Sequence, residues 1–215
     1  MSATKRYPVE ILTGKEVAAL MRTCSHTAPT GVRNRALIAM IYRAGLRISE
    51  ALALDPKDVD VEAGTIRVLH GKGDRSRVVG MDSGGFQELE RWINRRRLLG
   101  FNGRHPLFCT LAGKRVSADY VRQALPRMAK RAGIEKRVHA HGLRHTHACQ
   151  LREEGVDVGI ISKQLGHASI AVTAIYLDHI TPAQVIETIR SRTWDTPDAS
   201  REARRGRKTQ SECGG

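Results

Sequence analysis

Residues 139–147 read HAHGLRHTH, so four histidines and one arginine fall within nine positions. Imidazole nitrogens bind transition metals, whereas guanidinium groups bind oxyanions such as phosphate. The spacing of His141 and His145 would place both rings on one face of a helix, as a metal site requires. Arg144 stands between them and would repel a divalent ion, and no Asp or Glu lies close by in sequence to offset its charge. We therefore predict an anion site here and no metal.

The four histidines differ in their expected roles. His147 lies midway between two leucines of the apolar face, so it is expected in the core. His145 is expected to form structural hydrogen bonds behind the site, and His139 to precede the helix in a loop. His141 stands three residues before Arg144 at the expected helix start and shares its face, so it is the histidine placed to act.

The charge of the chain favours a polyanionic partner. Thirty-six Lys and Arg stand against 22 Asp and Glu, a formal net charge of +14 in 215 residues. A surplus of this size indicates nucleic acid first. No apolar run reaches about 18 residues, so no membrane span is expected, and the first ten residues hold no apolar stretch typical of a secretory signal. The four cysteines lack metal-site spacing and are interpreted as reduced thiols of a cytosolic protein.

Two arginines from distant parts of the chain suit phosphate chemistry. Arg47 and Arg144 each follow a Gly-Leu pair, in AGLRISEAL and HGLRH. Breaking a phosphodiester passes through a phosphorane-like state whose equatorial oxygens gain charge. One guanidinium group can hold two oxygens and keeps its proton, so two of them could clamp both non-bridging oxygens. Taken alone, either arginine would be interpreted as a solvated residue at a helix start.

The elements that must position these residues form a mainly α-helical α+β fold with one small antiparallel sheet. Thr13 and Glu16 predict a capping box, Gly45 a helix end, and Asp82 and Ser117 two further N-caps. The runs TIRVLH and RSRVVGM, joined by GKGD, predict a β-hairpin. Helices are expected at about 13–24, 31–45, 82–99, 117–131 (with Pro126 inside it), 142–154, 158–165 and 169–176, and from Thr181 onwards.

The composition changes after Arg192. The last 23 residues have almost no apolar periodicity and contain the basic run RRGRK. We expect a catalytic domain over residues 1–192 and a disordered basic tail over 193–215 that adds nonspecific attraction to phosphates.

The motifs also occur together in a recognisable order. They are AGLRISEAL with Arg47, HGKGDRSRVV with Lys72, HGLRH with Arg144, and QLGHASIAVTAIY with His167 and, nine residues later, Tyr176. This set resembles the motif set of the tyrosine recombinases, the phage integrase family of site-specific DNA recombinases. The resemblance covers roughly residues 10–190. One motif would be weak because GLR alone is common, but the ordered set is specific, and it implies the catalytic fold of that family.

The resemblance implies roles for the residues around the phosphate. Arg47 and Arg144 match the two phosphate-clamping arginines of the family, and His141 matches its histidine that shares proton handling and phosphate contact. Glu50 stands three residues after Arg47. It is expected either to support the arginines from behind or to be a solvated helix carboxylate.

The other matching residues would carry the reaction itself. His167 matches a His or Trp that hydrogen-bonds a phosphate oxygen, and Tyr176, displaced from the apolar stripe of its expected helix, matches the nucleophile. Lys72, at the expected hairpin tip, matches the lysine that protonates the leaving 5′-oxygen; its other interpretation is a turn lysine that contacts a phosphate. Attack would leave a covalent 3′-phosphotyrosine and a free 5′-hydroxyl. The step is reversible without ATP, metal or any other cofactor.

The expected partners follow from this chemistry. They are double-stranded DNA attachment or recombination sites, three further copies of the chain in a homotetramer on paired sites, and accessory DNA-bending or directionality proteins. The expected role is integration or excision of a phage or mobile element in the cytoplasm of a bacterial host cell. One departure from the family is that the catalytic pattern starts near residue 10, without a preceding core-binding domain. Either this is an excised catalytic domain or a minimal enzyme.

Two other functions remain open from sequence alone. A type IB topoisomerase-like enzyme would relax DNA with the same chemistry but without joining partner strands. A catalytically silent DNA-binding module of the same fold would have lost a motif residue, and none is lost. Assembly separates the first from a recombinase. The amphipathic segment TPAQVIETIRS could dock on a neighbouring protomer, or it could pack on its own core.

Overall fold

The computed structural model describes residues 10–69, 76–166, 186 and 190. By its internal contacts the chain divides into two units, residues 1–176 and 177–215, and all elements below belong to the first. These described residues form an α+β fold that is mainly α, as predicted, with one small antiparallel sheet. The elements are α1 (Gly14–Arg22), α2 (Pro29–Arg43), α3 (Ile48–Ala53), the 3₁₀ turn η1 (Pro56–Asp58), β1 (Val59–Asp60), β2 (Thr65–Val68), β3 (Arg77–Gly80), α4 (Ser83–Leu98), α5 (Ala118–Arg131), α6 (Ala140–Glu153) and α7 (Val158–Leu165).

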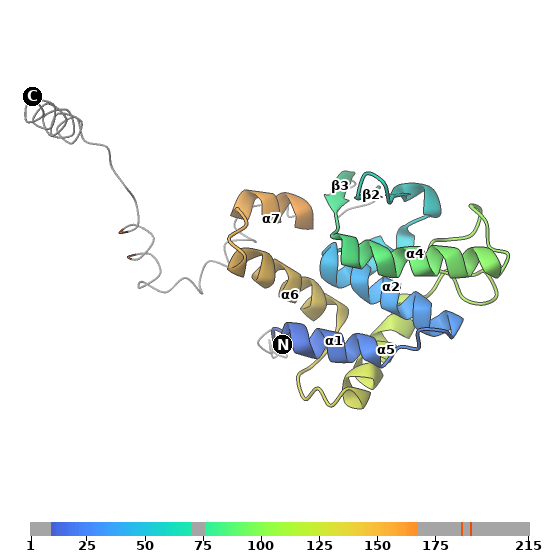
Figure 1. The fold of residues 1–215 in the computed structure, drawn as a ribbon, viewed down its shortest axis with the longest axis horizontal. Coiled ribbons are helices and arrows are strands. Elements are labelled where there is room, and N and C mark those ends of the chain that lie inside the picture. The colour runs from blue at the N-terminus through green and yellow to red at the C-terminus, as the bar shows by residue number, and fades with distance from the viewer. Residues whose placement is uncertain (1–9, 70–75, 167–185, 187–189, 191–215) are drawn as a thin grey trace, which may run out of the picture. The chain divides into compact units, whose positions relative to one another are not determined.

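Helix α2 is the centre of the core. Every residue from Gly31 to Ile41 is buried, the arginines at 33 and 35 included. A helix that is buried all round must be covered on several sides. Helix α2 packs against α3, α4 and α6, and Figure 1 shows α4 running alongside it. This packing holds α3 and α6, whose N-terminal ends carry predicted site residues.

The sheet confirms the predicted hairpin and adds a strand. Its order is β1-β2-β3, all antiparallel, with Ile66 opposite Val79 and Val68 opposite Arg77. Ile66, Val68 and Val79 are buried, so this face of the sheet is turned to the core. Strand β1 has two residues, too few for the alternation that predicts a strand. The tip of the hairpin, residues 70–75, lies outside the described residues.

The helix starts follow local capping chemistry. Thr13 and Glu16 form the predicted capping box of α1, and the predicted caps Asp82 and Ser117 accept hydrogen bonds at the starts of α4 and α5. Two helices start two residues earlier than predicted. Helix α2 begins at Pro29, because proline suits the first helical position. Helix α6 begins at Ala140 instead of residue 142, because the His139 ring caps it.

Several predictions fall on parts of the chain that the structure does not describe. They are the helices at 169–176 and from Thr181, apart from residues 186 and 190, and the tail at 193–215. The domain limit at residue 192 therefore stays a prediction. Within the described ranges, no helix is long and apolar enough to cross a membrane. The cysteines at 24, 109 and 149 are buried free thiols.

Candidate active site

The two predicted arginines meet where α3 and α6 begin and α7 ends. Arg47 is the N-cap residue of α3, and its Nη2 donates to the carbonyl oxygen of Gly166 at 3.4 Å. Arg144 lies in α6, and its Nη2 donates to the carbonyl oxygen of Leu165 at 2.6 Å. Its Nη1 donates to the carbonyl oxygen of Gly45. Adjacent carbonyls at the end of α7 thus hold guanidinium groups from residues 97 positions apart.

Glu50 lies between these arginines. Its side chain is 1% exposed, and Oε1 accepts from Nη1 of Arg47 at 2.7 Å. Oε2 accepts from the backbone N–H of Arg47 at 2.8 Å and lies 3.9 Å from Nη1 of Arg144. Of the two interpretations of Glu50, the supporting partner is confirmed and the solvated carboxylate is wrong. The carboxylate thus bonds both the guanidinium group and the backbone N–H of Arg47 and fixes the direction of that side chain.

A third arginine completes the cluster. Arg77, on β3, donates from Nη1 and Nη2 to the two oxygens of Glu50, both at 2.9 Å. Burial by itself would raise the pKa of Glu50, but the hydrogen bonds from Arg77 and Arg47 outweigh it and lower that pKa from 4.5 to about 2. Glu50 is therefore ionised at neutral pH. One carboxylate among three guanidinium groups leaves a net charge of +2, which suits a phosphate diester.

The sequence did not predict Arg77 or its neighbour Gln164. Side chains alternate along a strand, so Arg77 shares the inner face of β3 with Val79, and this signal was available. Gln164, on α7, donates to the carbonyl oxygens of Ala44 at 3.1 Å and Gly80 at 2.7 Å. A Cβ atom on Gly166, whose φ is +65°, would lie 2.8 Å from Cζ of Arg77. The end of α7 thus packs closely against the base of the hairpin.

His141 is the exposed histidine of the site. It is on the first turn of α6, on the same side as Arg144, as predicted. Partial burial lowers the pKa of His141, and the charges of Arg144 and Arg47 lower it further. Since its pKa lies below the ordinary 6.5, the ring is mainly neutral at pH 7 and can accept a proton.

The other histidines of the stretch are placed differently. His147 is buried, as predicted, and burial together with nearby Arg43 and Arg144 lowers its pKa to about 4. His145 is half-buried, and its structural role stays a prediction. His139 precedes the helix in extended backbone, as predicted, and is in addition the N-cap residue of α6.

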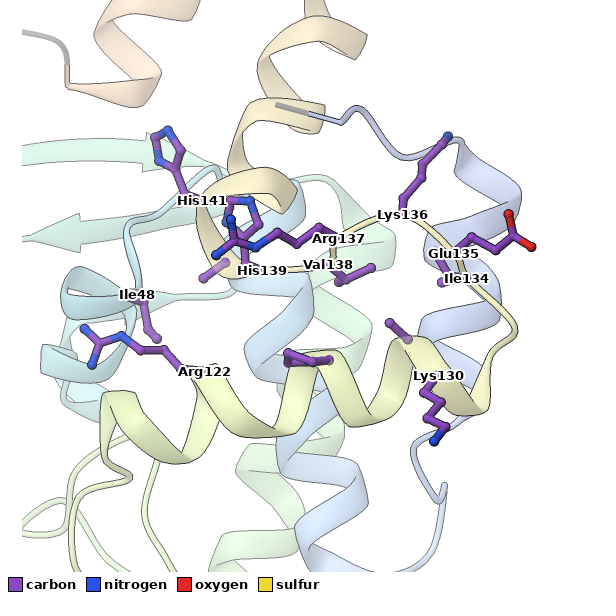
Figure 2. A pocket seen from close by; sticks show the side chains of 13 residues that line it. Ile48, Arg122, Lys130, Ile134, Glu135, Lys136, Arg137, Val138, His139 and His141 are labelled. Carbon is purple, nitrogen blue, oxygen red and sulfur yellow. The ribbon is translucent and has the colours of Figure 1, made fainter. Parts of the chain in front are cut away.

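A basic cavity of about 630 Å³ adjoins His141 (Figure 2). Its wall includes the apolar side chains of Ile48, Ile134 and Val138 and several cations from α5 and from the segment before α6. The charged and titratable lining residues are Arg122, Lys130, Glu135, Lys136, Arg137, His139 and His141. These cations add positive charge next to the arginine cluster, as a site for a polyanion would require.

A metal site needs several ligating side chains grouped together. Within the described ranges, no three His, Cys, Asp or Glu side chains are grouped so that they could hold a metal ion. No Asp or Glu is close to Arg144 in sequence, but one carboxylate is close to it in the fold. Glu50, 94 positions away in sequence, approaches it, and its oxygens accept hydrogen bonds from arginines.

The remaining predicted site residues cannot be placed beside these groups. Lys72, His167 and Tyr176 lie outside the described residues. Their roles as general acid, phosphate ligand and nucleophile stay predictions. The structure thus brings together Arg47, His141 and Arg144 out of the six residues that the sequence singled out.

Comparison with known proteins identifies the family. The model of the phage integrase family matches residues 10–181. The chain belongs to this family. It is 33% identical to the tyrosine recombinase XerD of Bifidobacterium longum over 189 residues, which are 83% of this chain and 61% of XerD. It is 37% identical to XerD of Mycobacterium leprae over 175 residues, 77% of this chain and 55% of that protein. The chain thus spans somewhat over half the length of these relatives.

Solved structures agree with this membership. The XerA recombinase is similar with a TM-score of 0.71 and 29% identity, over 86% of this chain and 66% of XerA. The XerH recombinase bound to its difH substrate has a TM-score of 0.71 and 30% identity, over 87% of this chain and 55% of XerH. The catalytic domain of bacteriophage HP1 integrase, at 20% identity, shares the fold with a TM-score of 0.60, over 86% of this chain and 95% of that domain. The fold is that of tyrosine recombinase catalytic domains.

Proposed function

We propose that this chain is a site-specific DNA recombinase that cleaves and rejoins strands through a covalent 3′-phosphotyrosine. The observation that carries the proposal is the cluster of Arg47, Glu50 and Arg144 beside His141. Two guanidinium groups held by one buried carboxylate and by backbone carbonyls are fixed before any substrate binds. Such preorganised cations stabilise charge that develops on phosphate oxygens without a cost of reorganisation.

The reaction assigns one task to each residue. Arg47 and Arg144 bind the non-bridging oxygens of the scissile phosphate, and the phenolic oxygen of Tyr176 attacks phosphorus. His141, neutral at pH 7, takes part in removing the phenolic proton. The bond from phosphorus to the 5′-oxygen breaks, and Lys72 donates a proton to that leaving oxygen. The strand then ends in a free 5′-hydroxyl, which can attack the phosphotyrosine and restore the phosphodiester.

The charge of the cluster favours this diester chemistry over binding of a metal. The cluster of three guanidinium groups and one carboxylate has a net charge of +2. We assign His167 as a further hydrogen-bond donor to the phosphate. In a metal-dependent nuclease, divalent ions would neutralise the phosphate oxygens. Here the arginines take that task, so we assign no cofactor to the reaction.

The wider role is proposed from the partners of similar proteins. The site-specific recombinase XerH is bound to its difH substrate in its solved structure, and the net charge of +14 of this chain suits duplex DNA. We assign double-stranded attachment or recombination sites as the substrate, and a homotetramer on paired sites as the working assembly. Integration or excision of a phage or mobile element in the bacterial cytoplasm, with accessory DNA-bending or directionality proteins, completes the proposal.

The decisive experiment captures the covalent intermediate. Nicked duplexes with a randomised sequence around the nick lose a short fragment on cleavage, so the strand cannot be rejoined and the protein stays attached. Wild-type protein should yield an adduct on denaturing gels, and sequencing of the attached strands supplies the target site. Tyr176→Phe removes one oxygen and should give no adduct while DNA affinity stays within about twofold, because the arginines remain. An adduct of comparable yield in Tyr176→Phe would contradict the assignment.

A further inference from the structure

His139 caps α6 with a nitrogen, whereas other capped helices use oxygen. Its backbone is extended (φ −149°, ψ 163°), and its Nδ1 accepts a hydrogen bond from the backbone N–H of Gly142 at 3.1 Å. Side-chain oxygens cap α1, α4, α5 and α7, from Thr13, Asp82, Ser117 and Asp157. Those oxygens accept at any physiological pH. An imidazole nitrogen accepts only while it carries no proton.

The cap is built into the turn that presents the site residues. The backbone N–H of Leu143 donates to the carbonyl oxygen of His139 at 3.1 Å, so backbone and ring of His139 both bond to the first turn. A Cβ atom on Gly142 would lie 3.3 Å from Nε2 of His139, so glycine leaves room for the ring. His141 and Arg144 are the second and fifth residues of the same helix. A change in the cap therefore acts directly on the residues proposed to bind phosphate.

The His139 ring lies at a cavity lined by several positive groups. The ring of His141 is stacked on it, with centroids 6.4 Å apart and planes 15° from parallel. Figure 2 shows both rings at the cavity with Arg137 beside them. The groups that share this cavity are Arg122 and Lys130 of α5, Glu135, Lys136 and Arg137 of the preceding segment, and His141 of α6. Of these groups, Arg137 and His141 are the ones whose charges act on the His139 ring and oppose its protonation.

Protonation of His139 would remove the cap for two reasons. The proton would sit on Nδ1, which faces the Gly142 N–H, so two donors would meet where a hydrogen bond now exists. The new cation would also stand at the positive end of the α6 dipole. Burial lowers the pKa of His139, and Arg137 and His141 lower it further. A depressed folded-state pKa means that the cap is fully present above the ordinary value of 6.5 and is lost as pH falls through the lower folded-state pKa.

We propose that His139 is a positioning residue: its unprotonated ring fixes the first turn of α6, and with it the directions of His141 and Arg144, and its protonation releases that turn. The part that concerns cleavage rests on the proposed function. The part that concerns the cap is a property of the folded chain alone. Three variants separate these parts. His139→Asn keeps a capping oxygen that does not titrate, His139→Ala removes the cap, and His26→Asn is a control at an exposed histidine of another segment.

The first measurement follows the Gly142 amide of the ¹⁵N-labelled full chain by NMR from pH 8 to pH 5. In the wild type and in His26→Asn its chemical shift should titrate with a midpoint below 6.5, and its hydrogen exchange should accelerate as pH falls relative to neighbouring amides. In His139→Asn the large shift change should be absent. A Gly142 titration in His139→Asn equal to that of the wild type would overturn the capping claim, because the titrating group would then be His141.

The second measurement is the rate of covalent-adduct formation at pH 7.5 and pH 5.5, on a duplex selected with the wild type. At pH 7.5 we expect His139→Asn to stay within about twofold of the wild type and His139→Ala to be slower by about fivefold, as loss of one cap suggests. Between the two pH values His139→Asn should lose less activity than the wild type does. Equal rates of the Asn and Ala variants at pH 7.5 would overturn the positioning role. If the wild type forms no adduct, the proposed function fails, and the Gly142 titration alone decides the capping claim.

Discussion

Replacing Glu50 with glutamine removes the negative charge shared by the arginines of the site and keeps the size of the side chain. The carboxylate is 1% exposed and accepts hydrogen bonds from Arg47 and Arg77, which lower its pKa from 4.5 to about 2. That fall corresponds to about 3 kcal/mol of preferential stabilisation of the ionised form in the folded state. Removal of one partner from a buried ion pair costs a similar amount, about 3–5 kcal/mol.

The sign of the pH dependence follows from the direction of the shift. Because the folded-state pKa is the lower one, the contribution of Glu50 is complete above pH 4.5 and is lost as pH falls towards 2. At pH 7 we expect Glu50→Gln to lower the free energy of unfolding by about 3 kcal/mol, and the melting temperature by about 6–12 °C. At pH 3.5 the difference between the two proteins should shrink to about 2 kcal/mol.

Urea unfolding at both pH values measures these differences. Asp119→Asn is a matched control, because Asp119 forms an equally short ion pair with Arg122 at 2.6 Å, but the two side chains are 78% and 65% exposed. An exposed pair of this kind contributes no more than about 0.5 kcal/mol. If Glu50→Gln changed stability as little as Asp119→Asn does, Glu50 would not organise the arginines. The claim that the arginines are fixed before substrate binds would then be refuted.

Three further predictions concern the DNA reaction. Adduct formation should proceed in excess EDTA, because arginines replace metal at the phosphate; inhibition by EDTA that magnesium or zinc reverses would show a metal site. DNA affinity should fall steeply with salt, and truncation after Arg192 should flatten that slope in titrations at several salt concentrations; an unchanged slope would mean that the RRGRK run does not contact DNA. With sulfur in place of the 5′-bridging oxygen, Lys72→Ala should recover most of its cleavage rate and Arg144→Ala far less, because a thiolate leaves without a proton. Equal recovery of both variants would contradict the role of Lys72 as general acid.

The features that local chemistry decides could be predicted from the sequence. The caps at Thr13, Asp82 and Ser117 depend on residues within one turn, and the hairpin depends on alternation and on a glycine-rich connection. Arg47 and Arg144 were paired by their resemblance to a family motif, since no local rule brings together residues 97 positions apart. The structure places them at consecutive carbonyls of α7.

What the sequence missed depends on tertiary neighbours or on unusual chemistry. The bidentate pair of Arg77 and Glu50 joins a strand to a helix 27 positions away, so it exists only once the sheet packs on α3. Residues with side-chain oxygens are the preferred N-caps, so the sequence did not predict that the imidazole of His139 caps α6. The roles of Lys72 and Tyr176 are supported by the motif resemblance, and the experiments above test them.

The most direct test of the central claim identifies the residue that becomes joined to DNA. The adduct of the wild type is digested with nuclease and trypsin, and the peptide that retains a nucleotide is sequenced by mass spectrometry. The chain has four tyrosines, and the tryptic peptide 164–190 contains Tyr176 and no other tyrosine. We predict a nucleotide on Tyr176 of this peptide, attached through a 3′-phosphate. A nucleotide on another residue, or attachment through a 5′-phosphate, would contradict the account.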